Sequence, residues 1–173
     1  AIWEANRSSD NLSLIQQLDY QSKLTKQLPI PELRVVYNRS GMHVVGAKLL
    51  DRRAIVSSGL YWMPAFSEAE ANYLCAILNS PITTEQVRPL MSYGKDERDI
   101  AKHIWELPIP RFDVNNTDHF RLAEIAAELE QVVANMQLRA NRYFSSLRQD
   151  IRAIIHERDD SREADEIIYE LIG

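Results

Sequence analysis

The sequence predicts an α+β protein, in which a small mixed β-sheet domain with short helices precedes a long helical, coiled-coil-like C-terminal part. Two short apolar segments around residue 40 are separated by a glycine, which is typical of paired strands. After residue 67 the apolar residues recur every three or four positions, which is the period of a helix. From residue 118 this helical spacing continues through residue 154 and indicates one long helix or two successive ones.

The chain divides into three predicted segments: a helical lead-in over 1–33, an α+β domain over 34–112 and a helical tail over 113–173. In the lead-in, Asp10-Asn11 offer side-chain acceptors for a helix start. Pro29-Ile30-Pro31 ends this segment, because neither proline donates a backbone hydrogen bond. Since the chain begins at Ala1 rather than at a methionine, we expect it to be either processed or a fragment of something longer, and the lead-in is interpreted as a linker from a missing upstream domain.

Four β segments are predicted in the middle of the chain. Residues 34–38 and 42–47 form the expected strand pair, and Gly41 between them supplies the positive φ that a short turn requires. Residues 54–56 and 60–63 are expected to add further β structure.

A helix is predicted to begin after Ser67, because Ser67 and Glu70 have the spacing of a capping box. Asn79-Ser80-Pro81 is expected to stop this helix. A second short helix, with Thr83 or Thr84 as its N-cap, is then predicted.

Further along, a turn of helix is expected at 100–103, followed by an extended segment over 107–110. The two prolines of that segment place it at the edge of a sheet or outside it. In the tail, Asp160 with Glu163 is predicted to cap a last helix. A heptad-like apolar stripe in the tail indicates helix packing, either on the domain itself or on a partner helix, and consists of Leu122, Ile125, Leu129, Val132 and Met136.

The charge is unevenly distributed along the chain. The formal net charge is −5, with balances of −1 over 1–33, +2 over 34–111 and −6 over 112–173. A basic middle segment permits nucleic-acid contact. No stretch is long and apolar enough to cross a bilayer, which excludes a membrane partner. A single cysteine, Cys75, indicates a reducing compartment, so a cytoplasmic location is expected.

No catalytic set of residues is visible in the sequence. The four histidines lack metal-ligand spacing, and no phosphate-binding loop, dinucleotide fingerprint or nucleophile elbow is present. Cys75 falls on an apolar helical face, which favours packing over nucleophilic chemistry. The sequence therefore predicts no catalytic residue and no metal site.

Several segments resemble, in order, the C-terminal target-recognition region of adenine-specific DNA methyltransferases of restriction–modification systems, and the similar domains of type I specificity subunits. These segments are residues 19–28, 34–41, 59–62, 71–80 (which ends in Leu78-Asn79-Ser80), 98–103, 107–113 (which begins Leu107-Pro108-Ile109-Pro110) and 164–173. The family's catalytic Asn-Pro-Pro motif and glycine-rich cofactor motif are absent.

The resemblance implies sequence-specific recognition of duplex DNA, which directs methylation by a catalytic domain absent from this chain. It implies no enzyme activity and no cofactor for the fragment, and an S-adenosylmethionine-dependent parent protein. The implied partners are double-stranded DNA, a methyltransferase domain in cis or subunit in trans, and a possible nuclease subunit.

The DNA-contacting candidates that follow from the resemblance are basic or aromatic residues in predicted turns and loops, because arginine reads guanine and lysine holds phosphates. They are Arg39, Lys48, Arg52, Arg53, Tyr93, Lys95 and Arg98. Four of them have a plainer interpretation: Arg52 and Arg53 form a solvated turn, Arg98 forms an ion pair with its acidic neighbours, and Tyr93 is part of a turn.

The main alternative is a helical subunit-docking or dimerisation module of a restriction–modification complex, with the β part serving as scaffold. The acidic tail and its long apolar stripe favour this alternative.

Overall fold

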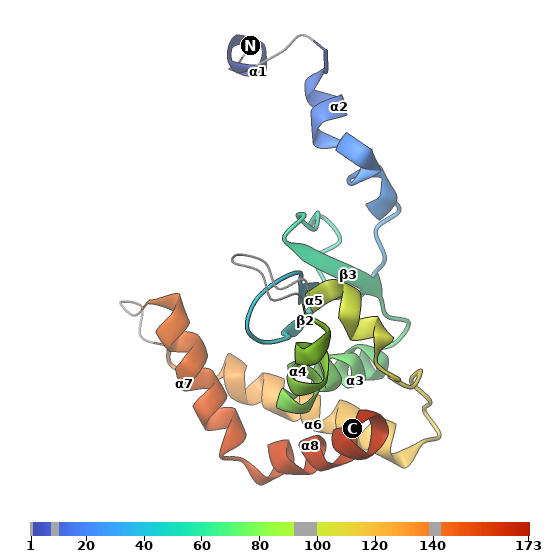
Figure 1. Ribbon diagram of the computed structural model, residues 1–173, viewed down its shortest axis with the longest axis vertical. Coiled ribbons are helices and arrows are strands. Elements are labelled where there is room, and N and C mark those ends of the chain that lie inside the picture. Colours follow the sequence, from blue (N-terminus) through green and yellow to red (C-terminus); the bar gives the residue numbers. More distant parts are fainter. Residues whose placement is uncertain (1, 8–10, 92–99, 139–142) are drawn as a thin grey trace.

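The computed structural model describes residues 2–7, 11–91, 100–138 and 143–173. A three-stranded sheet stands between an N-terminal arm and a helical body (Figure 1). Helix α3 (Glu68–Asn79) packs on the sheet with one side and on helix α6 (Thr117–Ala134) with the other, so the body is built in layers. The predicted α+β class is confirmed.

The sheet consists of β1 (Arg34–Asn38), β2 (Gly46–Leu49) and β3 (Leu60–Pro64) in the order β2-β1-β3. Both pairings are antiparallel, so the described sheet is antiparallel where a mixed one was expected. The physical reason is that short loops join the strands, whereas a parallel pair needs a long crossover.

Strand β2 begins at Gly46 and not at residue 42, because the side chain of Asn38 takes over the turn. Its amide nitrogen donates to the carbonyls of Ser40 and His43, and its amide oxygen accepts the Val45 N–H. Gly41 does have positive φ, at 143°. Because β1 ends at Asn38 and β2 begins at Gly46, the connection is a seven-residue loop over 39–45 rather than a short turn.

Residues 54–56 are not a strand, because side chains rather than a neighbouring strand bind their backbone. Arg34, fully buried, donates to the carbonyls of Asp51 and Ala54, both at 2.9 Å. Gln27 donates to the Val56 carbonyl at 2.9 Å and accepts the Val56 N–H at 2.8 Å. The Gln27–Val56 pair also ties the N-terminal arm to the body.

Helix α3 starts as predicted, with the Ser67 hydroxyl accepting the Glu70 N–H. The Glu70 carboxylate, however, accepts the N–H of Phe66 instead of that of Ser67. The next helix, α4 (Pro81–Val87), is capped by Ser80. Thr83 and Thr84 lie inside α4 and are buried, so the prediction of either as N-cap is wrong; Pro81 already fits the first helical position.

The remaining short elements lie in the arm and between α4 and α6. They are α1 (Ile2–Asn6), α2 (Leu14–Leu18), η1 (Tyr20–Ser22), η2 (Thr25–Gln27), η3 (Arg88–Leu90), α5 (Ile100–His103) and η4 (Ile104–Glu106). Ser13 caps α2 in a full capping box, so the start was predicted two residues too early. Residues 107–110 lie outside the sheet, as the prolines required.

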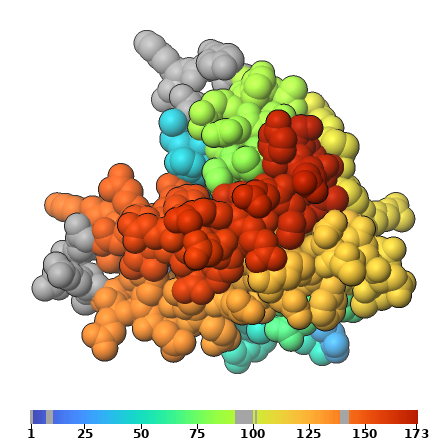
Figure 2. Space-filling view, turned by 90° about the horizontal axis from the view of Figure 1, so that it is seen from below, coloured from blue at the N-terminus to red at the C-terminus, as the bar shows by residue number. Residues whose placement is uncertain are grey.

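The tail forms three helices, α6, α7 (Phe144–His156) and α8 (Asp159–Ile172). Helix α6 ends at Ala134, so the stretch from 122 to 154 is not one helix. Figure 2 shows α8 lying between α4 and α6, and it contacts both. The predicted Asp160 cap is wrong: Asp160 lies inside α8, whose N-cap is Arg158, two residues earlier, and the Asp160 carboxylate binds the Arg158 side chain.

The hydrophobic core is continuous from the sheet into the tail. Val35 of β1, Ile77 of α3, Ile125 of α6 and Ile168 of α8 belong to one cluster and are at most 1% exposed. The predicted division at residue 113 therefore runs through a shared core. No helix within the described ranges combines the length and apolarity needed to cross a bilayer.

Candidate nucleic-acid interface

Lys48, one of the predicted DNA-contact residues, is paired with two glutamates of the chain itself. Its side chain is 9% exposed, and its ammonium lies 2.7 Å from Glu130 and 3.2 Å from Glu68. Burial opposes the charged form, but the hydrogen bonds to Glu130 and Glu68 outweigh it and raise the pKa of Lys48. Lys48 thus joins β2 to α3 and α6, and it is not available to a phosphate.

Arg52 and Arg53 lie in the exposed turn after β2. Arg52 is 3.1 Å from Glu32, and Arg53 is 3.2 Å from Asp51. Exposed pairs of this kind contribute about 0–1 kcal/mol, so an incoming phosphate can displace the carboxylates.

Arg39 follows β1 directly, and its backbone N–H donates to the Gly59 carbonyl at 3.2 Å. Its side chain is half-buried and forms no ion pair with any described residue. Tyr93, Lys95 and Arg98 lie outside the described residues.

A second group of basic residues lies on helix α7. Arg148, Arg152 and His156 are spaced four residues apart, which places them along one face of the helix. Arg148 lies over the ring of Phe144, with its guanidinium carbon 5.6 Å from the ring centre. Burial is the first cause that lowers the pKa of Arg152, and the positive charge of Arg148 is the second.

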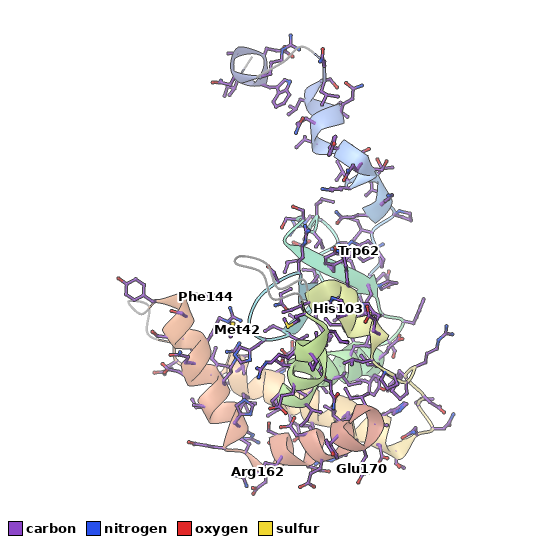
Figure 3. The ribbon with its side chains drawn as sticks, viewed as in Figure 1. Met42, Trp62, His103, Phe144, Arg162 and Glu170 are labelled. Atoms are coloured by element: carbon purple, nitrogen blue, oxygen red, sulfur yellow. The ribbon has the colours of Figure 1, made fainter. Side chains whose placement is uncertain are left out.

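The β1–β2 loop and the end of α4 face this stripe. The Val44 N–H donates to the Thr84 hydroxyl at 3.1 Å, which fixes the loop against α4. Arg88 follows Thr84 by one helical turn, and His43 precedes Val44. Figure 3 shows Met42, the other neighbour of His43, in the space between the sheet and α7.

These five side chains, His43, Arg88, Arg148, Arg152 and His156, form what we call the basic cluster. The pKa of His43 lies below its usual value, first because neighbouring atoms partly desolvate the ring and then because the charges of Arg152, Arg88, Arg148 and His156 repel a proton. Two separate parts of the chain, η3 and α7, therefore bring positive charge close to the His43 ring.

Among the described residues, the arginines of the basic cluster have no acidic partner, unlike Arg121 of α6 and the arginines at the start of α8. Arg121 binds Glu163 at 2.6 Å, Arg158 binds Asp160 at 2.6 Å and Arg162 binds Asp159 at 2.7 Å. In the part of the chain that the structure describes, Arg88, Arg148 and Arg152 form no ion pair. Their charge is uncompensated.

An aromatic group lies on the sheet. Tyr37 stacks on Tyr61 with ring centres 5.8 Å apart, and the Trp105 indole N–H donates to the Tyr37 hydroxyl at 2.9 Å. Tyr61 is 38% exposed and Trp105 42% exposed. Both rings thus pack against neighbouring side chains and remain partly exposed to solvent.

A metal site and a nucleophilic cysteine find little support in the described residues. They contain no group of three or more histidine, cysteine or acidic side chains arranged as metal ligands. Burial raises the pKa of the Cys75 thiol to about 12, so this thiol is protonated at neutral pH and a poor nucleophile.

The α7 stripe could have been found from sequence, since its spacing of four is visible there. It was missed because residues 122–154 were treated as one apolar stripe. The approach of His43 and Arg88 to α7 carries no sequence signal. The predicted apolar stripe packs at least partly against the protein itself: Leu122 and Ile125 are fully buried, while Leu129, Val132 and Met136 are half-buried.

No protein-family model, curated protein or solved structure matches this chain. The chain is an α+β protein whose basic cluster contains arginines that form no ion pair with any described residue. The function proposed below rests on that cluster.

Proposed function

We propose that this chain recognises duplex DNA sequence-selectively, as the target-recognition end of a restriction–modification adenine methyltransferase. The observation that carries the proposal is the basic cluster: arginines from η3 and α7, which form no ion pair with any described residue, all act on His43 of the β1–β2 loop in a chain of net charge −5. Charge of this kind attracts the phosphate backbone, which supplies much of the affinity of DNA-binding proteins.

The two tasks of such a protein divide between the cluster and the neighbouring loop. Phosphate contacts fix the position of the protein on DNA, whereas base contacts select the sequence. Arg39 lies at the start of the loop that carries His43, so backbone binding at the cluster brings Arg39 near the bases. An arginine fork on guanine contributes about 1–3 kcal/mol of discrimination. Arg52, Arg53, Tyr93, Lys95 and Arg98 remain candidates, and Lys48 does not.

The chemical step belongs to other parts of the assembly in this proposal. The chain selects the site, and a methyltransferase domain or subunit that binds S-adenosylmethionine modifies adenine there. A nuclease subunit is a further possible member of the complex, in the cytoplasm.

Fluorescence anisotropy with labelled duplexes over a salt series tests the backbone contact. Each phosphate contact contributes roughly 0.9 to the slope of log affinity against log salt. The double variant Arg148→Gln/Arg152→Gln should therefore lower the slope by roughly 2. The matched control, Arg158→Gln/Arg162→Gln, removes the same charge from arginines that are already paired and should leave the slope nearly unchanged.

Selection from a random duplex library tests sequence selectivity. Enrichment of a common site by the wild type, and relaxation at one position in Arg39→Ala, are the expected results. Absence of duplex binding at low salt would refute the proposal, and binding without enrichment would remove its sequence-selective part.

The docking module remains the second candidate, because one surface feature favours it. A groove of about 370 Å³ between the segment after α6 and helix α7 is lined mainly by apolar residues, among them Met136, Leu147 and Ile154, together with Gln137 and Asp150. Phe144, at the start of α7, is 73% exposed. Sedimentation of the chain separates the two functions: a stable oligomer that dissociates in Leu147→Asp supports docking, and a monomer counts against it.

A further inference from the structure

His43 is the one titratable group of the basic cluster that faces arginines from two different elements. Arg88 approaches it from η3, and Arg148, Arg152 and His156 approach it from α7. At the far end of the cluster, the charge of His156 acts on Asp165 of α8, which also feels the charge of Glu85 of α4. Asp165 interacts with His156 and accepts a hydrogen bond from Ser80 at 2.7 Å.

We infer that the basic cluster is a binding site for one phosphate group, held by Arg88, Arg148 and Arg152, and that His43 takes up a proton when the phosphate binds. This inference rests on the proposed function only for the source of the phosphate, which we take to be the DNA backbone. A free phosphate ion has the same chemistry and is distinguished by experiment.

The arrangement suits a tetrahedral anion because its donors come from different directions. Arg148 and Arg152 lie one helical turn apart, with about 5–6 Å between β-carbons, and Arg88 lies on a different element, η3. Guanidinium groups bind phosphate oxygens in pairs of parallel hydrogen bonds, which fixes the orientation of the anion. The His43 ring completes the set from the loop.

The donors are attached to fixed backbone, which lowers the entropy lost when an anion binds. The loop that carries His43 is held on one side by the Val44–Thr84 hydrogen bond and on the other by the Asn38 amide, which donates to the His43 carbonyl at 2.9 Å. Arg88 begins η3 directly after α4. The backbone that carries these side chains is thus held in place before the ligand arrives, which reduces the ordering that binding requires.

The electrostatic consequence follows from the signs of the charges. Without ligand, partial desolvation and then the neighbouring cations keep the pKa of His43 below its usual value, so the ring is neutral at pH 7. A bound phosphate brings negative charge and oxygen acceptors, both of which favour the protonated ring. The pKa of His43 is therefore higher in the complex, and affinity rises as the pH falls between the two pKa values. One proton gives at most a tenfold change per pH unit.

Nuclear magnetic resonance of the histidine rings in the whole chain measures this directly. The His43 signal is assigned with His43→Gln, and its pH titration is recorded for the free chain, with a non-specific duplex and with inorganic phosphate. We expect the duplex to raise the pKa of His43 by about 1. His103, which contacts Glu106 at 3.0 Å, is the internal control and should not respond.

Duplex affinity at pH 6 and pH 8 and at constant salt supplies the second readout. Wild type and His103→Gln should bind several-fold more tightly at pH 6, whereas His43→Gln should lose most of this difference. In Arg148→Gln/Arg152→Gln the pKa of His43 should rise in the free chain, because two repelling charges are gone, and should respond little to duplex.

The outcomes separate the inference from the proposed function. If the pKa of His43 rises with duplex, the site holds backbone phosphate. If it rises only with inorganic phosphate and no duplex binds, the phosphate site stands and the DNA function fails. If duplex binds without changing the pKa of His43, or if the arginine variant responds like wild type, the phosphate site is refuted and DNA binding stands.

Discussion

Replacing Asn79 by alanine removes an amide that covers an open strand edge. Strand β2 is an edge strand, and it pairs only with β1 in the described sheet. Just before β2, the Asn38 N–H donates to the Val45 carbonyl. Because hydrogen-bonded and non-hydrogen-bonded pairs alternate along an antiparallel ladder, the next pair, Tyr37 with Gly46, is a non-hydrogen-bonded one. The N–H and carbonyl of Gly46 consequently point away from β1. Asn79 binds both of them.

The energetic cost can be worked from the hydrogen bonds lost. The Asn79 amide accepts the Gly46 N–H at 3.2 Å and donates to the Gly46 and Cys75 carbonyls, both at 2.8 Å. At about 1 kcal/mol for each bond, the loss is roughly 3 kcal/mol. Alanine's higher helix propensity returns up to about 0.7 kcal/mol. Water reaches the exposed side of Asn79, so the net loss should be about 2 kcal/mol.

Urea unfolding followed by circular dichroism measures this loss. With a slope of about 1–3 kcal/mol per molar urea, the midpoint should fall by about 1 M in Asn79→Ala. Asn79→Asp keeps the acceptor for Gly46 but places a carboxylate against two carbonyls. It should be at least as destabilising at pH 7 and recover partly below about pH 4, where the protonated carboxyl can donate.

The matched control is Asn115→Ala, because the Asn115 amide bonds only to exposed Asp113. This variant should stay within about 0.5 kcal/mol of wild type. A loss as small as that in Asn79→Ala would refute the edge-covering role, and would leave the Leu-Asn-Ser segment free for a recognition role.

Three further predictions concern the packing and titration of the core. A β-carbon added at Gly46 would lie 2.8 Å from the Leu78 side chain, so Gly46→Val should lower the unfolding free energy by about 1–3 kcal/mol. In urea unfolding, the loss in the double variant Gly46→Val/Leu78→Ala should be smaller than the sum of the two single losses, because the smaller side chain removes the clash. The Cys75 thiol, with its pKa raised to about 12 by burial, should react with iodoacetamide at pH 8 much more slowly than in urea; equal rates would contradict its burial. Burial raises the pKa of Asp165, so its folded form binds a proton more tightly than the unfolded form and stability is lost as pH rises above the unfolded value. Asp165→Asn, which keeps an acceptor for Ser80, should raise the melting temperature at pH 7 but not at pH 3.

Local sequence signals located most elements of the fold. Strands β1 and β3 and helix α3 lie where the apolar period and the Ser67 cap placed them. These signals work because a strand, a helix turn and a cap each depend on residues within about four positions. The start of β2 was misplaced because Asn38 competes with the strand ladder for backbone groups.

The candidate site was predictable only in its chemistry. The sequence indicated Arg39 at the β1–β2 connection, and Arg39 does lie there, whereas His43 of the same loop was not predicted as a site residue. It could not tell that Lys48 is bound by Glu130, because the two are far apart in the chain and only the packing of α6 on α3 brings them together. Which cations are neutralised depends on such long-range pairs.

By itself, the sequence determined the α+β class and the helical period of the segments after residue 67. Only the tertiary structure decided that Lys48 is unavailable and that Arg88, His43 and the α7 arginines share one surface. The reason is physical: secondary structure is set by interactions between near neighbours, whereas the electrostatics of a surface is a sum over all charges within several ångströms, whatever their separation along the chain.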